Sequence, residues 1–147
     1  MRNIDKLIVH CSATREGQDI SVDTIRGWHV IERGWSDIGY HYVIYLDGTI
    51  MPGRPEEIQG AHCRGHNKTS LGICYIGGVE IDGKTAKDTR TQEQKSALKA
   101  MLLELKSVYC DAIVHSHRDF SSKACPSFDA TTEYEWISKH YDVEEEI

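Results

Sequence analysis

Short apolar runs recur along the chain, and four of them have the length of buried strands. They cover residues 6–9, 42–46, 71–76 and 112–114. The run at 42–46 is rich in aromatic and β-branched residues, and Asp47-Gly48 follows it. Asp-Gly after such a run is a strong hairpin signal, so we expect residues 49–51 to pair back onto it.

A first helix is predicted after the first strand. Ser21 is a residue type that caps helices well, because its hydroxyl accepts a hydrogen bond from a free backbone N–H. Ile25, Trp28 and Ile31 follow at three-residue spacing, which predicts one apolar helix face. Gly34 is suited to end this helix.

The longest apolar stripe lies in the second half of the chain. Residues 91–94 (Thr-Gln-Glu-Gln) have the pattern of a capping box. The stripe that follows predicts a helix of about five turns; it consists of Leu98, Met101, Leu102, Leu105, Val108 and Tyr109. Residues 82–90 are polar, and we expect a surface loop there. A last amphipathic helix is expected after Asp129, with Tyr134, Ile137 and Tyr141 on its apolar face.

Strands mixed with helices, one pair of them a hairpin, predict an α/β fold in which helices pack on a mixed sheet. The length of 147 residues suits a single domain. We expect its core at residues 6–141 and an acidic tail at 142–147. No apolar run approaches 18 residues, so no transmembrane helix and no membrane insertion are expected. The N-terminal residues lack the apolar core of a signal peptide.

Charge and cysteine content narrow the function classes. The formal net charge of −6 argues against a general nucleic-acid binder, which usually carries a basic footprint. The five cysteines are odd in number and show no repeated spacing, so a disulfide framework is not expected. Four of them are expected to be packed as small apolar side chains: Cys11, Cys63, Cys74 and Cys110. Cys125 differs because of its neighbours.

Those neighbours make residues 115–129 the richest source of candidate chemistry. The segment places His115, His117, Lys123 and Cys125 close together and has no helical period. Histidine and cysteine are common zinc ligands. His117 and Cys125 are more than two helical turns apart, so they would have to ligate from a loop. His10 follows the first apolar run and offers a third ligand.

Three protein ligands would leave a zinc ion one open position, as in catalytic sites, whereas structural sites are closed by four. A fourth ligand is available in His115, Cys11 or His62. Spacing alone therefore leaves a catalytic and a structural zinc site equally open. His10 and His117 both follow predicted strand ends, where α/β proteins usually place their sites.

Four blocks of sequence carry a family resemblance. They are Val9-His10-Cys11-Ser12-Ala13-Thr14; Trp28-His29 with Gly34-Trp35 and Gly39-Tyr40-His41-Tyr42; Gly60-Ala61-His62 with Gly65-His66-Asn67 and Ser70-Leu71-Gly72-Ile73; and His117 through Lys123-Ala124-Cys125-Pro126-Ser127-Phe128-Asp129. In order and content they resemble the zinc-dependent N-acetylmuramoyl-L-alanine amidases of the phage-lysozyme type, relatives of the peptidoglycan recognition proteins. The last block is the most specific.

The resemblance implies a central mixed sheet flanked by helices, with one zinc ion in a surface cleft. It implies zinc ligands at His10, His117 and Cys125, and a catalytic pair at Tyr40 and Lys123. Recognition proteins that have lost catalysis typically lack the cysteine, so its presence favours an active enzyme.

Further residues of these blocks are candidates for lining the cleft. Trp28, His41 and His62 are candidate substrate contacts, although packing roles suit them as well. His115 is expected to be structural and not a ligand.

The implied reaction is hydrolysis of the amide between N-acetylmuramic acid and L-alanine in peptidoglycan, as in an endolysin. We expect a monomer whose partner is the cell wall, with no nucleic acid, held in the cytoplasm until its release. One alternative is a non-catalytic muropeptide-binding module, which Cys125 and Lys123 count against. Another is a phage amidase that also inhibits RNA polymerase; that activity is associated with sequence ahead of the first zinc histidine, where this chain has nine residues.

Overall fold

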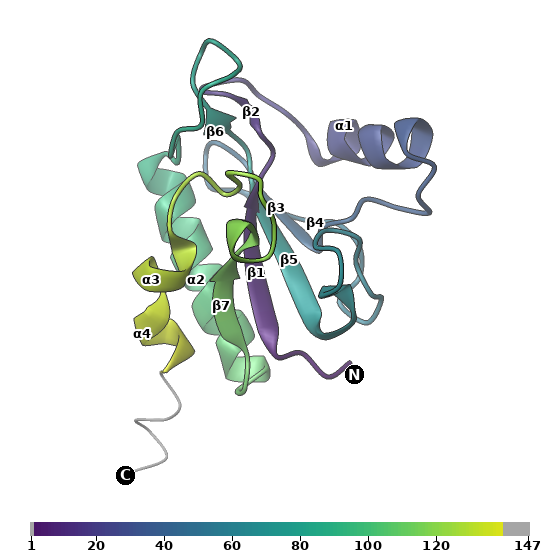
Figure 1. Ribbon diagram of the computed structural model, residues 1–147, viewed down its shortest axis with the longest axis vertical. Helices are drawn as coiled ribbons and strands as arrows, with labels where there is room; N and C mark the ends of the chain where they lie inside the picture. The colour runs from purple at the N-terminus through teal and green to yellow at the C-terminus, as the bar shows by residue number, and fades with distance from the viewer. Residues whose placement is uncertain (1, 140–147) are drawn as a thin grey trace.

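A five-stranded mixed sheet forms the centre of the fold in the computed structural model, which describes residues 2–139. Its strands run in the order β4-β3-β5-β1-β7 (Figure 1). They are β1 (Lys6–Cys11), β3 (Tyr42–Ile44), β4 (Ile50–Pro52), β5 (Ser70–Tyr75) and β7 (Ile113–Ser116). A separate pair joins β2 (Thr14–Arg15) to β6 (Gly78–Val79), which the apolar pattern did not predict.

The central strand β1 pairs in parallel with both β5 and β7, and β3 pairs in parallel with β5. The edge strand β4 is antiparallel to β3, which confirms the predicted hairpin and the mixed sheet. β5 is buried at every position, and β1 is buried from Leu7 onward. Burial on both faces explains why these two strands read as continuous apolar runs and show no alternation.

Helices cover both faces of the sheet. On one face α2 (Gln92–Val108) packs with the short helices α3 (Ala130–Glu133) and α4 (Glu135–Ser138), as Figure 1 shows. On the other face α1 (Val22–Gly27) covers a smaller apolar cluster and continues into a π-helical turn, η1 (Trp28–Glu32). Two single 3₁₀ turns complete the described elements, η2 (Asn67–Thr69) and η3 (His117–Asp119). Among the residues that the structure describes, no helix combines the length and apolarity needed to cross a bilayer.

The sheet faces determine where polar side chains of β1 lie. Leu7, Val9 and Cys11 belong to the core cluster that α2 covers. Because successive side chains on a strand point to opposite faces, Ile8 and His10 point to the other side. His10 therefore lies at the carboxyl end of β1, on the face away from α2.

The capping box predicted for the long helix is confirmed. Thr91 Oγ1 accepts a hydrogen bond from Gln94 N at 3.0 Å, and Gln94 Oε1 accepts one from Thr91 N at 2.9 Å. The Gln94 side-chain amide also donates to the carbonyls of Ile44 and Ile76. The cap thus ties the start of α2 to the ends of the sheet strands.

The first helix begins as predicted, with Ser21 as its cap. The expected inward position of Ile31 is wrong, since this residue is 83% exposed. The π-helical turn that starts at Trp28 has a wider hydrogen-bonding pattern than an α-helix. This turn changes which side chains point inward, and His29 is buried in place of Ile31.

Two other helix predictions need correction. Val108 is 50% exposed, because α2 ends there and Tyr109, at its C-cap, takes the inward position. The last helix is interrupted at Tyr134, which separates α3 from α4. Tyr141 and the acidic tail at 142–147 lie outside the described residues.

The loop at 82–90 is exposed as far as Asp88, but its last two residues, Thr89 and Arg90, are buried. The Arg90 guanidinium forms ion pairs with Asp88 and Glu133, each at 2.9 Å. Its central carbon lies 3.4 Å from the centre of the Phe128 ring. The expectation of a surface loop is therefore wrong for Arg90, which joins this loop to α3 and to the segment that follows Cys125.

We predict that Arg90→Met lowers the free energy of unfolding by about 2–3 kcal/mol, because charged hydrogen bonds contribute about 1.5–3 kcal/mol each and their partners here are partly exposed. Arg26→Met is the matched control: Arg26 pairs with Asp23 and Asp37 at the surface, where such pairs contribute about 0–1 kcal/mol. Urea denaturation measures both. Equal effects of the two variants would contradict a special role for Arg90.

Candidate metal centre

Three separate parts of the chain bring candidate ligands to one place. His10 lies near the end of β1, His117 directly follows β7, and Cys125 lies in the loop between η3 and α3. β1 and β7 are parallel neighbours, with Val9 opposite Ser116. His10 follows Val9 and His117 follows Ser116, so the two histidines lie side by side at the carboxyl edge of the sheet. This edge is the usual position of sites in such sheets.

The donor atoms of His10, His117 and Cys125 all lie within 4.8 Å of one another. His10 Nδ1 is 3.8 Å from Cys125 Sγ, and the rings of His10 and His117 have centroids 4.5 Å apart. Two ligands of one tetrahedral zinc ion lie roughly 3.3–3.6 Å apart, given the usual zinc–nitrogen and zinc–sulfur bond lengths. Small movements of these side chains would therefore complete the coordination of a metal ion.

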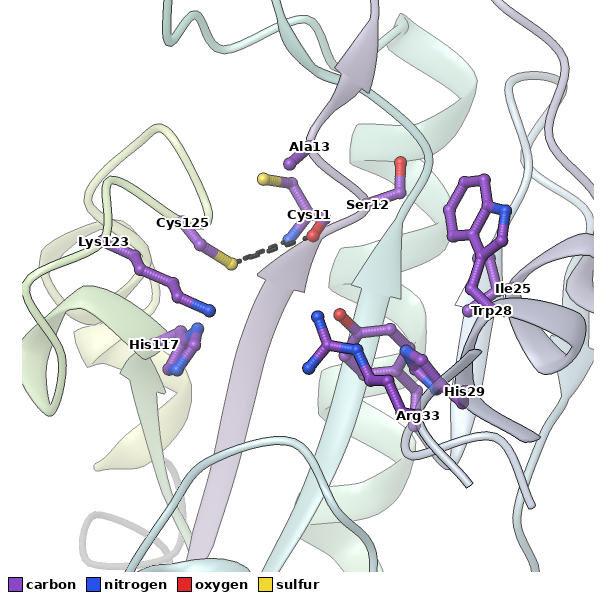
Figure 2. Close-up of a pocket in the computed structure, with 11 residues that line it drawn as sticks. Cys11, Ser12, Ala13, Ile25, Trp28, His29, Arg33, His117, Lys123 and Cys125 are labelled. Atoms are coloured by element: carbon purple, nitrogen blue, oxygen red, sulfur yellow. Dashed lines mark hydrogen bonds between the residues drawn. The ribbon is translucent and has the colours of Figure 1, made fainter. Parts of the chain in front are cut away.

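The hydrogen bonding of these side chains also fits a metal ion. His117 Nδ1 is buried and has no hydrogen-bond partner among the residues that the structure describes. Buried polar atoms without a partner are rare, because each costs the full desolvation penalty. Cys125 Sγ accepts a hydrogen bond from Cys11 N at 3.2 Å, a contact that stabilises a thiolate (Figure 2). Without a metal, the Cys11 side chain and burial raise the pKa of the Cys125 thiol above its ordinary value, so a bound cation is what would favour the thiolate. These three residues can hold a metal.

The loop that carries Cys125 is held by hydrogen bonds from the sheet side. Tyr75 donates to the Pro126 carbonyl at 2.6 Å, and the Ser127 hydroxyl donates to the Gly78 carbonyl at 2.7 Å. The cysteine is therefore placed by residues on β5 and β6, far from it in sequence.

The residues considered as a fourth ligand do not join the group. Cys11 belongs to the apolar cluster under α2; its side chain also contacts Cys125, but it is not in the donor group. His62 contacts His10 on the nitrogen that points away from Cys125, at 2.8 Å. His115 lies on β7 opposite Ile8 in register, before His117 leaves the strand in η3, and its ring packs 5.1 Å from that of Phe120.

Two hollows meet at this group of ligands. A cavity of about 190 Å³ lies on the side of α1 and is bordered by Trp28 and Tyr40. A larger cleft of about 630 Å³ is bordered by Trp35 and the loop at 61–67. Arg33, His117 and Lys123 line both hollows, and Figure 2 shows Lys123 and Arg33 reaching toward the smaller one from different sides.

The structure places both members of the implied catalytic pair at this junction. The Tyr40 ring lies 5.1 Å from that of His10. Burial raises the pKa of the Tyr40 phenol well above its ordinary value. The ammonium group of Lys123 lies near both histidines, where its charge contributes to the lowered pKa of His10 and of His117, each caused first by burial.

The candidate substrate contacts are distributed differently. Trp28 borders the smaller cavity and His62 the larger cleft. His41 is buried and lines neither; its Nδ1 accepts a hydrogen bond from Gly72 N at 3.1 Å. His41 is thus a core residue that braces β5.

Three residues near the cleft were given no role by the sequence analysis. Arg33 stacks over the Trp35 ring, with its guanidinium carbon 5.2 Å from the ring centre. His29 Nδ1 accepts a hydrogen bond from Gly39 N at 2.9 Å and so supports the backbone next to Tyr40. His29 lies within the π-helical turn, and Arg33 and Trp35 follow it. The three-residue apolar spacing that predicted a helix here gives no signal for any of these residues. What could have drawn attention to these residues is their position in or next to Trp28-His29 and Gly34-Trp35, which belong to the blocks that carry the family resemblance.

Comparison with known proteins identifies the family. The sequence profile that describes N-acetylmuramoyl-L-alanine amidases matches residues 1–128. This chain belongs to the N-acetylmuramoyl-L-alanine amidase family. It is 44% identical over 124 residues to the endolysin of Klebsiella phage KP32, covering 84% of this chain and 81% of the relative. The endolysin of Escherichia phage T7 is 42% identical over 125 residues, covering 85% and 82%.

Solved structures agree with this amidase assignment. N-acetylmuramoyl-L-alanine amidase LysC from Clostridium intestinale superimposes with a TM-score of 0.77 at 28% identity, covering 96% of this chain and 87% of that one. Bumblebee PGRP-SA gives a TM-score of 0.76 at 26% identity, covering 92% and 82%. The predicted α/β fold and family are confirmed: the protein is an N-acetylmuramoyl-L-alanine amidase that hydrolyses peptidoglycan.

We predict that Cys125→Ser weakens metal binding by more than about 100-fold, because a weakly acidic hydroxyl replaces a thiolate. Loss of a residue that only supports a ligand can already weaken binding by roughly 100-fold. Metal content of the purified amidase and a competition titration measure this. Cys110→Ser is the control: the expectation that Cys110 packs as an apolar side chain is wrong, since it is an exposed free thiol. A Cys125→Ser protein that binds metal as the parent does would remove this cysteine from the centre.

Proposed function

We propose that this amidase is a zinc-dependent endolysin in which His10, His117 and Cys125 hold one zinc ion. The observation that carries the proposal concerns His117: its Nδ1 is buried and has no hydrogen-bond partner within residues 2–139, and the residue lies in one donor group with His10 and Cys125. A nitrogen lone pair in this environment is best satisfied by a cation.

The composition of the donor group favours zinc over other cations. Two imidazoles and one thiolate suit zinc, whereas magnesium and calcium prefer oxygen ligands. Three protein ligands are also the number found in catalytic zinc sites. When bound, zinc supplies polarisation of the scissile carbonyl and activation of water.

Lys123 is the residue that we assign to stabilising the reacting carbonyl oxygen. That oxygen gains negative charge when the amide carbon becomes tetrahedral, and an ammonium group nearby offsets it. Lys123 lines both hollows and lies near His10 and His117. The contribution of one such donor is typically about 10²–10³ in rate.

We assign Tyr40 to orientation and hydrogen-bond donation. Because burial raises the pKa of its phenol well above the ordinary value, the hydroxyl keeps its proton at neutral pH. A protonated phenol can donate a hydrogen bond to the attacking water or to the carbonyl oxygen, but it is a poor base. This separates the role of Tyr40 from direct proton abstraction.

The shape of the site suits a substrate that extends in two directions from the scissile amide. The scissile amide joins a sugar to a peptide, so two arms leave the reacting centre in different directions. The smaller cavity beside Trp28 and the larger cleft beside Trp35 meet where Lys123 and His117 lie. Of the candidate substrate contacts we retain Trp28, whose ring borders the smaller cavity.

Mass spectrometry of peptidoglycan digested by the purified protein tests the reaction. An amidase releases peptides with new L-alanine amino termini and leaves the number of reducing-end sugars unchanged. An increase in reducing ends would identify a glycosidase instead. Binding of peptidoglycan without any released fragment would identify a non-catalytic module.

We predict that Tyr40→Phe and Lys123→Ala each lower kcat by about 10²-fold or more, the scale of a lost transition-state donor. Both variants should keep their zinc, since neither side chain belongs to the donor group. Lys84→Ala, a change in the exposed loop before α2, is the control. Normal turnover in the two cleft variants, or loss of zinc from them, would show that these roles are misassigned.

A further inference from the structure

The two ring nitrogens of His10 have different partners. Nδ1 lies 3.8 Å from Cys125 Sγ, on the side of the other ligands. Nε2 lies 2.8 Å from Nδ1 of His62. A neutral imidazole that ligates a metal through Nδ1 carries its hydrogen on Nε2. His10 Nε2 is therefore the donor in this contact, and His62 Nδ1 is the acceptor.

Because Nδ1 of His62 accepts, the hydrogen of this neutral ring is on Nε2. His62 Nε2 lies 3.3 Å from the hydroxyl oxygen of Ser70, a fully buried residue at the start of β5. A chain of two hydrogen bonds thus runs from the ligand His10 through His62 to the sheet. Both nitrogens of His62 are engaged in it, which leaves neither for the substrate in the adjoining cleft.

We propose that His62 is a positioning residue for the metal centre, which fixes the tautomer and the orientation of His10 by accepting the hydrogen of its Nε2. This inference rests on the proposed zinc site. Ligating histidines commonly donate their second N–H to a carboxylate, a carbonyl or water. Here a second neutral imidazole takes that place.

The fold is built to hold the His62 ring where it lies. The side-chain oxygen of Asn67 accepts hydrogen bonds from the backbone N–H groups of His62 and Cys63, each at 2.9 Å. On the opposite side, a Cβ at Gly72 would lie 2.6 Å from the His62 ring. Glycine at this position of β5 is what allows the ring to pack against the strand. These contacts fix the acceptor independently of any ligand.

His41 provides a matched comparison within the same polar layer. Its ring lies edge-on to that of His62, with centroids 5.8 Å apart. Its nitrogens contact Gly72 N, the Ile58 carbonyl and Arg2, and none of these contacts involves His10. Replacing His41 disturbs the same layer without removing the acceptor for His10.

The experiment is a zinc competition titration of the purified full chain and three variants. We expect His62→Leu, which fills similar space without an acceptor, to weaken zinc binding by about 10–100-fold. His62→Asn should recover most of the affinity, because its side-chain oxygen can occupy the place of Nδ1. His41→Leu should bind zinc as the parent does.

A second readout distinguishes positioning from general damage to the fold. In the cobalt-substituted protein, the visible spectrum should change for His62→Leu and return toward that of the parent for His62→Asn. Melting of each metal-free variant reports its folding. The proposal is overturned if His62→Leu keeps the parent affinity, if His62→Asn is as weak as His62→Leu, or if His41→Leu loses as much. A parent protein that binds no zinc would instead overturn the zinc site itself.

Discussion

The parallel pairing of β1 with β7 is the constraint on which the rest of the site depends. The register of Val9 opposite Ser116 makes His10 and His117 neighbours at the same edge of the sheet. Neither strand contributes more than one ligand. The third ligand has to come from a loop that returns to this edge. Residues distant in sequence hold that loop: Tyr75 and Gly78 by hydrogen bonds, and Arg90 by stacking on Phe128.

The site brings together polar groups whose burial destabilises the folded protein before any ligand binds. The buried His117 Nδ1 has no hydrogen-bond partner in the described part of the chain, and the partly buried Cys125 sulfur accepts a hydrogen bond from a backbone N–H. Such groups lower the stability of the metal-free protein. A metal that binds only the folded state stabilises that state, so metal binding and folding are coupled.

The parts of the fold that could be predicted from sequence are those with local signals. The Asp47-Gly48 hairpin and the capping box at Thr91 depend on residues a few positions apart, and both are confirmed. The π-helical turn at Trp28 and the burial of Arg90 depend on packing between distant segments. Their sequences look like an ordinary helix and a polar loop, which explains why Ile31 and Arg90 were misplaced.

The ligand set illustrates the same limit. Residue types and spacing left His115, Cys11 and His62 open as further ligands, and the choice among them came from family resemblance. The structure separates them by position. Cys11 belongs to the core cluster and is not in the donor group, His115 lies further back along β7, and His62 meets His10 on the nitrogen away from Cys125. The positions of these side chains depend on strand register and on the path of the loops, and no local sequence pattern predicts either.

X-ray absorption at the zinc edge of the purified protein tests the central claim most directly, because it counts the ligand types around the metal. With His10, His117 and Cys125 as ligands, we expect one sulfur at about 2.3 Å and nitrogen or oxygen neighbours at about 2.0–2.1 Å. Two sulfurs would bring Cys11 into the site, and none would exclude Cys125. Either result would contradict a centre held by His10, His117 and Cys125.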